Sequence, residues 1–305
     1  MGRRCRKTAP FFLPQERKKI MPGQLYLCAT PIGNLEDITL RVLRILKEVD
    51  LIAAEDTRNS IKLLNHFDIH TPMTSYHEYN RFEKGEALVE KMREGQSVAL
   101  ITDAGTPGIS DPGEVLVSLC QKAGIPVTSL PGPAACITAL TLSGKPTRRF
   151  AFEAFLPAQK KEREEILLEL KRETRTIILY EAPHHLVKTL TDLREALGNR
   201  EATLCRELTK IHEDVFVSDL DGLLEKYKDT QPLGECVLVL KGLEKEALAR
   251  EEAKSWQTLS IGEHVAYYEG LGNDRKTAMK LAAADRGITR REAYALLEQE
   301  KGKAF

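Results

Sequence analysis

Short apolar runs alternate along the N-terminal half of the chain with segments whose apolar positions recur at helical spacing. Four runs bounded by turn residues predict buried strands: Gln24–Ala29, Leu51–Ala54, Ser97–Thr102 and Pro126–Leu130. The periodic segments between and after them predict helices: Ile38–Lys47, Asn59–His66, Arg81–Arg93, Gly113–Ala123 and Ala134–Leu142. Because strands and helices alternate, the order predicts an α/β domain with a largely parallel sheet covered on both faces.

A polar segment, Ser143–Arg149, contains Gly144 and Pro146 and predicts a domain boundary. The same alternation resumes beyond it, so a second α/β domain is expected. Its predicted strands are Phe150–Phe155, Thr176–Tyr180, Ala202–Arg206, Asp214–Ser218 and Glu235–Lys241. Its predicted helices are Lys160–Arg172, His184–Leu197 and Asp219–Tyr227.

The chain becomes charged, Ala-rich and helical after Gly242. Ser260 with Glu263, and Thr289 with Glu292, have capping-box spacing. Two predicted helices, Asp274–Ala284 and Arg290–Glu298, are separated by Gly287 as in a helix-turn-helix. Nucleic-acid contact and a small helical packing unit both explain this pattern. We therefore expect a basic, disordered leader (1–22), two α/β domains (23–145 and 146–243) and a helical domain (244–305).

Charge is balanced over the whole chain but unevenly spread. Of 45 basic and 45 acidic residues, seven basic and one acidic lie within the first twenty positions, so the rest of the chain is net acidic. A nucleic-acid binder with this body must gather its positive charge locally. The leader itself is either a basic RNA-binding arm or a dispensable extension, since Met21 directly precedes the first strand; a chain starting at Met21 is expected to fold and act normally.

The six cysteines lie far apart and show no zinc-binding spacing, which predicts free, buried thiols and no metal site. No apolar run approaches the roughly 20 residues that span a bilayer. The N-terminus lacks the apolar segment of a secretory signal. These features predict a cytoplasmic protein without a membrane partner.

Three Gly- and Pro-rich loops follow predicted strands of the first domain: Ala29–Asn34, Thr102–Gly113 and Leu130–Ala134. In open α/β sheets, ligands bind beyond the carboxyl ends of the strands. Three such loops at equivalent strand ends predict a nucleotide-sized ligand laid across them. A dinucleotide fingerprint and a P-loop are both absent. Loops rich in backbone groups without a phosphate-binding Lys suit an uncharged adenosine with a zwitterionic tail.

A set of motifs carries a family resemblance: ATPIGNLEDIT, AAEDTR, SYHEYN, LITDAGTPGISDPG, LPGPAACITAL, FEAFLPA, RELTK and GECVLVLKG. Together they resemble the ribosomal RNA small subunit methyltransferase I family, within the tetrapyrrole-methylase-like (class III) S-adenosylmethionine methyltransferases. The similarity covers about Gln24 to Lys241 and extends to a similar helical C-terminal domain. One departure is Ala154, where this family usually has Gly.

The resemblance implies a homodimer that methylates the 2′-hydroxyl of cytidine 1402 in the 16S rRNA of the small ribosomal subunit, with S-adenosyl-L-methionine in a cleft between two α/β domains. It implies cofactor binding by residues of the three loops and by two residues of the second domain. Those residues are Pro31, Asp103, Ala104, Gly105, Thr106, Pro107, Gly132, Pro133, Ala134, Tyr180 and Glu235. Methyl transfer from a sulfonium needs no metal, which agrees with the missing metal motif.

Polar residues at strand ends are the candidates for substrate binding. Glu55 and Asp56 would orient the ribose and Arg58 would meet a phosphate, although Asp56 or Thr57 would equally cap the next helix. Arg206 would supply local positive charge, and Glu181, beside Tyr180, would orient the ligand.

For removal of the hydroxyl proton we expect Lys210 and His77, one from each domain, to act together. Two other functions stay open. One is a methyltransferase of the same superfamily acting on a tetrapyrrole or another small molecule, whose members usually carry a Gly-rich first loop. The other is a non-catalytic RNA-binding module built on the C-terminal helices, which would bind no S-adenosylmethionine.

Overall fold

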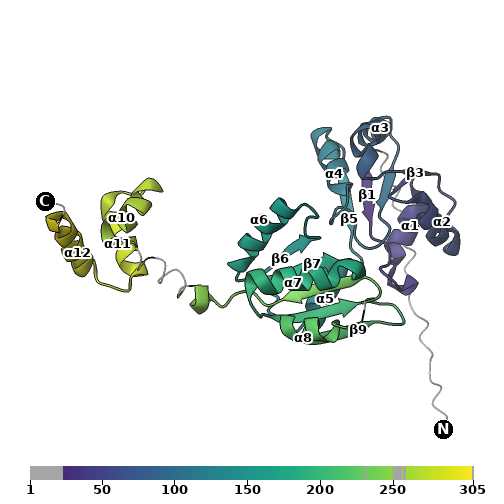
Figure 1. Ribbon diagram of the computed structural model, residues 1–305. Coiled ribbons are helices and arrows are strands. Elements are labelled where there is room, and N and C mark those ends of the chain that lie inside the picture. Colours follow the sequence, from purple (N-terminus) through teal and green to yellow (C-terminus); the bar gives the residue numbers. More distant parts are fainter. Residues whose placement is uncertain (1–22, 231, 249, 251–255, 257–258, 304–305) are drawn as a thin grey trace, which may run out of the picture. The chain divides into compact units, whose positions relative to one another are not determined.

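The computed structural model describes residues 23–230, 232–248, 250, 256 and 259–303 (Figure 1). The predicted leader, residues 1–22, lies outside the described residues. Within the described part, the chain forms two compact units. One reaches Thr138 and includes the loop Glu207–Glu213; the other comprises Ala139–Arg206 and continues from Asp214. The domain limits expected from the sequence stay a prediction, because the division between these units falls inside a helix.

The first unit contains a five-stranded parallel sheet with the order β3-β2-β4-β1-β5, which confirms the predicted parallel arrangement. Its strands are β1 (Leu25–Cys28), β2 (Leu51–Ala54), β3 (Met73–Ser75), β4 (Val98–Ile101) and β5 (Val127–Leu130). The sequence did not predict β3, because three half-buried residues beside Pro72 show no apolar run. All five strands end at the same edge of this sheet.

Helices cover both faces of this sheet, as its alternating side chains require. They are α1 (Leu40–Glu48), α2 (Thr57–His66), α3 (Arg81–Arg93) and α4 (Gly113–Lys122), with 3-10 turns η1 (Leu35–Asp37) and η2 (Glu78–Asn80). The helix α5 (Ala135–Leu142) follows β5, and from Ala139 it belongs to the second unit. Tyr26 and Cys28 of β1 belong to the core under α1 and α2, whereas Leu25 and Leu27 face the core under α3 and α4. The strands are short and buried on both faces, so their order fixes where the connecting loops emerge.

The second unit contains a mixed sheet with the order β6-β7-β10-β8-β9. Its strands are β6 (Phe150–Ala154), β7 (Thr176–Glu181), β8 (Glu201–Arg206), β9 (Asp214–Asp219) and β10 (Cys236–Leu240). Only β6 and β7 are parallel; the remaining neighbours are antiparallel. The helices α6 (Lys160–Lys171), α7 (Leu186–Leu197) and α8 (Leu220–Lys226) build one core with the sheet.

Three helices follow near the C-terminus: α10 (Ile261–Gly270), α11 (Arg275–Asp285) and α12 (Arg290–Lys303). The predicted capping box of Ser260 and Glu263 is present, and Thr289 and Glu292 make the same reciprocal hydrogen bonds. Gly287 adopts a left-handed φ of 63° between α11 and α12. The three helices enclose a small apolar core of their own. The chain thus combines two α/β units, each built on one sheet, with a helical C-terminal region, as the sequence predicted.

Some helix boundaries differ from those that the apolar pattern predicted. The helix expected from His184 begins at Leu186, because Pro183–His185 form a separate 3-10 turn. Among the described residues, no helix is long and apolar enough to cross a membrane. The five cysteines within the described range are free and buried, as expected, whereas Cys5 lies outside it.

Candidate functional site

Two of the three predicted loops are joined to each other by backbone hydrogen bonds. The N–H of Thr30 donates to the carbonyl of Gly105 at 2.9 Å, and the N–H of Gly105 donates back at 3.1 Å. The hydroxyl of Thr30, only 1% exposed, donates to the carbonyl of Thr102 at 3.1 Å. The loop after β1 is therefore fixed to the loop after β4 before any ligand binds.

The third loop is fastened to the other two. The hydroxyl of Thr106 donates to the carbonyl of Pro133 at 2.8 Å. Gly132 lies so close to β1 that an added Cβ would stand 2.5 Å from the Cβ of Ala29. Gly105 holds a φ of +90°, which disfavours any side chain there. The predicted convergence of the three loops is thus observed, and two of their glycines are required by the geometry.

The ligand-facing candidates of these loops differ in exposure. Asp103, Ala104 and Gly132 are exposed, and Pro31, Thr106, Pro133 and Ala134 are half-buried. Asp111 fixes the far half of the second loop, since its carboxylate accepts hydrogen bonds from the backbone of Gly108, Ile109 and Gly113. The sequence reasoning did not single out Asp111. Its place three residues after Gly108 in a Gly-Pro loop, typical of Asx turns, would have indicated it.

Acidic residues after β2 reach the second loop. Asp103 accepts hydrogen bonds from the N–H of Asp56 at 3.2 Å and from the amide of Asn59 at 3.4 Å. Glu55 accepts a hydrogen bond from the hydroxyl of Thr102 at 2.7 Å. Asn59 is a connection that the sequence reasoning missed, because a polar residue in the first turn of a helix has no distinctive pattern. The candidate substrate residues after β2 are therefore linked directly to the candidate cofactor loop.

Asp56 has both of the roles between which the sequence left a choice. It caps α2 by accepting from the N–H of Arg58 at 2.8 Å, and it also pairs with the Arg58 guanidinium at 2.8 Å. The hydrogen bonds from Arg58 hold the pKa of Asp56 at about 2. The Arg58 side chain is 88% exposed. Water screens the ion pair between Arg58 and Asp56, so the guanidinium can leave Asp56 and bind an incoming phosphate.

His77 follows β3 and opens the turn η2. Its N–H donates to the Asn80 side chain at 2.8 Å, and its Nε2 lies 3.3 Å from the Asn80 amide nitrogen. Its Nδ1 is buried without a hydrogen-bond partner. A turn therefore fixes the imidazole at the carboxyl edge of the first sheet, with one ring nitrogen unused.

Lys210 lies in the loop Glu207–Glu213 between β8 and β9. Its ammonium group pairs with Glu207 at 2.9 Å, and its Cγ would stand 2.5 Å from a Cβ added to Gly33. Glu207 and Thr209 hold left-handed φ values of 49° and 66°. The loop thus packs against the loop after β1 and belongs to the same compact unit as His77. The expectation that the two residues come from different domains was wrong. The loop that carries Lys210 belongs to the first unit, although the strands that it connects, β8 and β9, belong to the second.

The candidates on the second sheet have structural partners. The Tyr180 ring packs edge-on against Phe152, with centroids 4.9 Å apart, whereas Glu235 is exposed just before β10. Glu181 is buried and accepts from the hydroxyl of Thr189 and the N–H of Ala182.

Arg206 also has a partner, because its guanidinium pairs with Asp214 at 2.8 Å. Burial lowers the pKa of Arg206, but the hydrogen bond that it donates to the Asp214 carboxylate and the neighbouring negative charges outweigh burial and raise it. The free positive charge expected from Arg206 and Lys210 is therefore compensated by neighbouring carboxylates.

The comparisons with known proteins bear on this geometry. Residues 24–224 match the family described as tetrapyrrole (corrin/porphyrin) methylases. The ribosomal RNA small subunit methyltransferase I of Halalkalibacterium halodurans is 48% identical over 278 residues, covering 91% of this chain and 96% of that protein. The protein of the same name from Bacillus subtilis is 44% identical, covering 89% of this chain and 93% of that protein. The chain belongs to the ribosomal RNA small subunit methyltransferase I family.

Solved structures support the fold of this family member. Diphthine synthase superposes with a TM-score of 0.59 at 15% identity, over 74% of this chain and 92% of that one. Uroporphyrin-III-C-methyltransferase from Thermus thermophilus superposes with a TM-score of 0.52 at 21% identity, over 72% of this chain and 94% of that one. At these identities the likeness confirms the tetrapyrrole-methylase fold and leaves the substrate to other observations.

Proposed function

We propose that this chain transfers a methyl group from S-adenosyl-L-methionine to the rRNA of the small ribosomal subunit. The observation that carries the proposal is that the motifs shared with its methyltransferase relatives form one prearranged site. The loops after β1, β4 and β5 hold one another through Thr30, Gly105, Thr106 and Pro133. The relatives named for this activity match almost the entire chain.

The residues present fit the cofactor. Two glycines bring backbone close to backbone at the three-loop site, and the exposed edges of the loops offer N–H and C=O groups. We assign the cofactor contacts to Pro31, to Asp103–Pro107 and to Gly132–Ala134 in the first unit, with Tyr180 and Glu235 from the second. Asp103 is suited to the ribose or the amino group, because its carboxylate is exposed while its backbone is fixed. When bound, the cofactor supplies an electrophilic methyl group.

The protein's own contribution is positioning and proton removal. We assign the acceptor to the 2′-hydroxyl of cytidine 1402 in 16S rRNA. Arg58 and the carboxylates of Glu55 and Asp56 lie after β2, next to the second loop, and would hold the nucleotide there. Sequence-specific RNA recognition favours nucleotides splayed out of a single strand, which such a site receives more readily than paired ones.

Lys210 and His77 are the groups to which we assign the proton. The ammonium group of Lys210 would stabilise the developing alkoxide, and the His77 imidazole would accept the proton at Nε2, the ring nitrogen that faces the Asn80 amide. Both belong to the first unit, so assembling this pair needs no domain closure. Arg206 and Glu181 would help to position the nucleotide without taking part in the chemistry. Arg206 pairs with Asp214, and Glu181 accepts a hydrogen bond from the N–H of Ala182.

We further propose a cytoplasmic homodimer. Two large apolar side chains of the first unit, Leu40 and Tyr79, are 85% and 97% exposed, and contact with a second copy would remove such side chains from water. Mass measurement of the native protein in solution tests the dimer. A monomer at micromolar concentration would contradict it.

Transfer of labelled methyl from S-adenosylmethionine to small subunits of a strain lacking this modification tests the function. We expect stoichiometric labelling of 16S rRNA by the full chain. Labelling of a tetrapyrrole instead would favour a small-molecule methyltransferase, and failure to bind S-adenosylmethionine would favour an RNA-binding module.

A further inference from the structure

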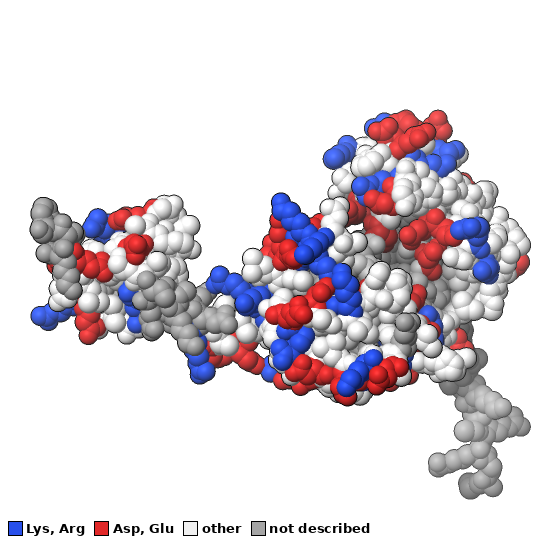
Figure 2. Space-filling model, viewed as in Figure 1, with Lys and Arg blue, Asp and Glu red and all other residues white. Residues whose placement is uncertain are grey.

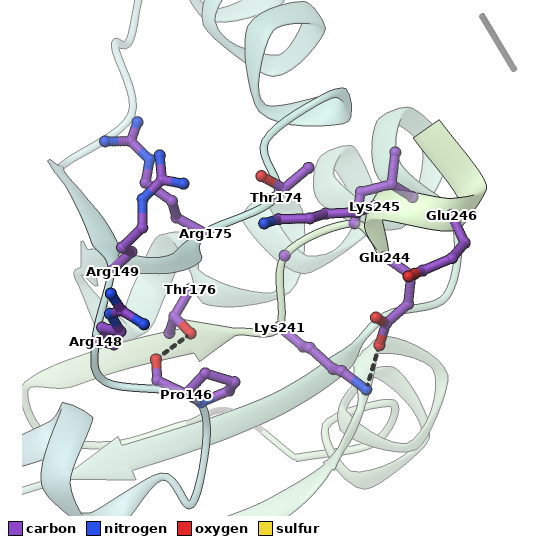
Figure 3. A pocket seen from close by; sticks show the side chains of 12 residues that line it. Pro146, Arg148, Arg149, Thr174, Arg175, Thr176, Lys241, Glu244, Lys245 and Glu246 are labelled. Atoms are coloured by element: carbon purple, nitrogen blue, oxygen red, sulfur yellow. Dashed lines mark hydrogen bonds and ion pairs between the residues drawn. The ribbon is translucent and has the colours of Figure 1, made fainter. Parts of the chain in front are cut away.

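A cavity of about 500 Å³ opens in the second unit, where β6 and β7 begin and β10 ends (Figure 3). Five cations line it: Arg148, Arg149, Arg175, Lys241 and Lys245. The guanidinium groups of the three arginines lie on one side, and Lys245 extends its side chain from the other (Figure 3). The only acidic residues of its lining are Glu244 and Glu246.

The walls of this cavity are fixed by the backbone. The hydroxyl of Thr176 donates to the carbonyl of Pro146 at 2.7 Å, which anchors the segment that carries Arg148 and Arg149. The N–H of Leu243 donates to the carbonyl of Glu173 at 2.7 Å. Gly242 leaves no room for a Cβ beside the backbone of Thr174. The cavity is therefore a formed feature of the sheet edge and not a gap between loose side chains.

Two of the five cations are compensated by carboxylates. Arg175 pairs with Glu173 at 2.6 Å, and Lys241 pairs with Glu201 at 3.0 Å and with Glu244 at 2.8 Å. The hydrogen bonds that Arg175 and Lys241 donate to these carboxylates raise the pKa of both residues. These two residues belong to the frame of the cavity.

The other three cations are in surplus. Arg148, Arg149 and Lys245 make no hydrogen bond or ion pair with any residue that the structure describes, and Glu246 alone opposes them. All three side chains are exposed, so water screens their mutual repulsion, and an anion bound in the cavity would lower that repulsion further. Arginine forks match phosphate oxygens in pairs, which favours phosphate over a single small anion.

Within the second unit, this cavity is separate from the two residues assigned to the cofactor. In the antiparallel pair of β7 and β10, Cys236 faces Glu181 and Leu240 faces Ile177. Tyr180 and Glu235 thus lie at the opposite edge of the second sheet, roughly 13 Å away along four residues of strand. The surrounding surface is otherwise mixed: positive and negative side chains are interspersed on the face seen in Figure 2. A local site of surplus positive charge stands out against that background.

We propose that this cavity binds the phosphodiester backbone of the substrate RNA, with Arg148 and Arg149 contacting phosphates and Lys245 closing the site. The inference rests on the proposed function, which supplies a polyanionic substrate. An acidic body of this kind needs a local patch to hold RNA. Phosphate contacts at this end of the second sheet would set the register of the RNA and leave the chemistry unchanged.

The test compares the full chain with R148Q/R149Q and with the control K160Q/K161Q. The control removes an adjacent pair of exposed lysines from α6, outside this cavity, that lie 3.8 and 3.9 Å from Glu164 and Glu165. Binding to unmodified small subunits is measured at about 50 to 200 mM salt, where phosphate contacts dominate the salt dependence. Each lost contact should lower the slope of log K against log salt by about 0.7 to 0.9.

We expect R148Q/R149Q to lower the slope by about 1.4 to 1.8 and the control to leave it unchanged, with S-adenosylmethionine affinity and thermal unfolding of both near wild type. An unchanged slope in R148Q/R149Q, or an equal fall in the control, would overturn the proposal. A charge reversal, R148E/R149E, should weaken binding further, and equal affinity there would overturn it too. Methylation by the wild type in the same preparation separates this outcome from failure of the proposed function.

Discussion

Ala154 holds a left-handed backbone conformation that normally favours glycine. Its φ is +49°, and the register between β6 and β7 shifts at that point, between Phe152 and Ala154. A Cβ in the left-handed region costs roughly 1–2 kcal/mol, so glycine is the residue that this backbone conformation favours. The chain tolerates the strain because the bulge is held by its neighbours in the sheet.

Replacing Ala154 by Gly should therefore stabilise the protein. Relief of strain exceeds the greater entropy of an unfolded glycine, leaving a net gain of about 0.5–1 kcal/mol. Thermal unfolding of A154G against wild type measures it, with Ala158→Gly, outside any regular element, as a matched control. A transition at or below that of wild type would show that the bulge carries no strain.

The buried cysteines allow a second test at the residue level. Burial raises the pKa of the Cys28 thiol to about 12 and that of Cys120 to about 11. Only the thiolate reacts, so both should resist thiol reagents at pH 8 in the folded protein and react at once after denaturation. Mass spectrometry after brief alkylation locates the labelled sites. Rapid labelling of Cys28 in the native protein would contradict the buried position of β1.

Lys210 and His77 allow the assignment of proton removal to be tested. Lys210→Ala and His77→Ala should each lower single-turnover methylation by about 100-fold or more, the usual scale of acid–base groups, with S-adenosylmethionine affinity unchanged. Lys210→Arg separates two roles, because it retains a stabilising cation but cannot act as a base. If both alanine variants lose less than tenfold, catalysis is mainly positioning.

Among the elements, the three loops of the first sheet act as one structure, and Gly132 is the place to test it. A Cβ at Gly132 would collide with Ala29 at 2.5 Å and displace the third loop. Overpacking costs roughly 1–3 kcal/mol, so Gly132→Ala should weaken S-adenosylmethionine binding by about tenfold or more.

The matched variant A29G/G132A restores the space by removing the opposing methyl group. It should regain most of the affinity, as calorimetry would show. If G132A alone bound S-adenosylmethionine with wild-type affinity, the third loop would not be part of the cofactor site. Gly105 is a less clean position for such a test, because its φ of +90° strains any side chain regardless of the ligand.

The sequence predicted elements better than it predicted their pairing. Alternating buried runs were sufficient for the parallel sheet, because parallel strands buried on both faces leave a strong apolar pattern. The antiparallel placement of β10 between β7 and β8 follows from tertiary packing and leaves no local pattern. The three loops proposed to bind the cofactor were recognised because Gly and Pro mark them. The position of Lys210 beside Gly33 was not found, since far more than a hundred residues separate the two in the chain.

At the scale of the whole molecule, the prearranged loop site belongs to a protein whose positive and negative side chains are interspersed on the face that Figure 2 shows. Such a body gives no general attraction to RNA, so substrate selection depends on local contacts. Binding of small subunits should therefore fall with salt through only a few phosphate contacts. A slope corresponding to many contacts would instead indicate a broad basic surface.

The most direct test of the central claim is to locate the methyl group. The wild-type chain, S-adenosylmethionine and small subunits from a strain lacking this modification are incubated, and the product 16S rRNA is digested and analysed by mass spectrometry. We expect one added methyl group on the ribose of cytidine 1402, at its 2′-oxygen. At limiting S-adenosylmethionine its yield should fall in G132A and recover in A29G/G132A. A methyl group on a base or at another nucleotide would contradict this. So would RNA that carries no added methyl group although the cofactor binds.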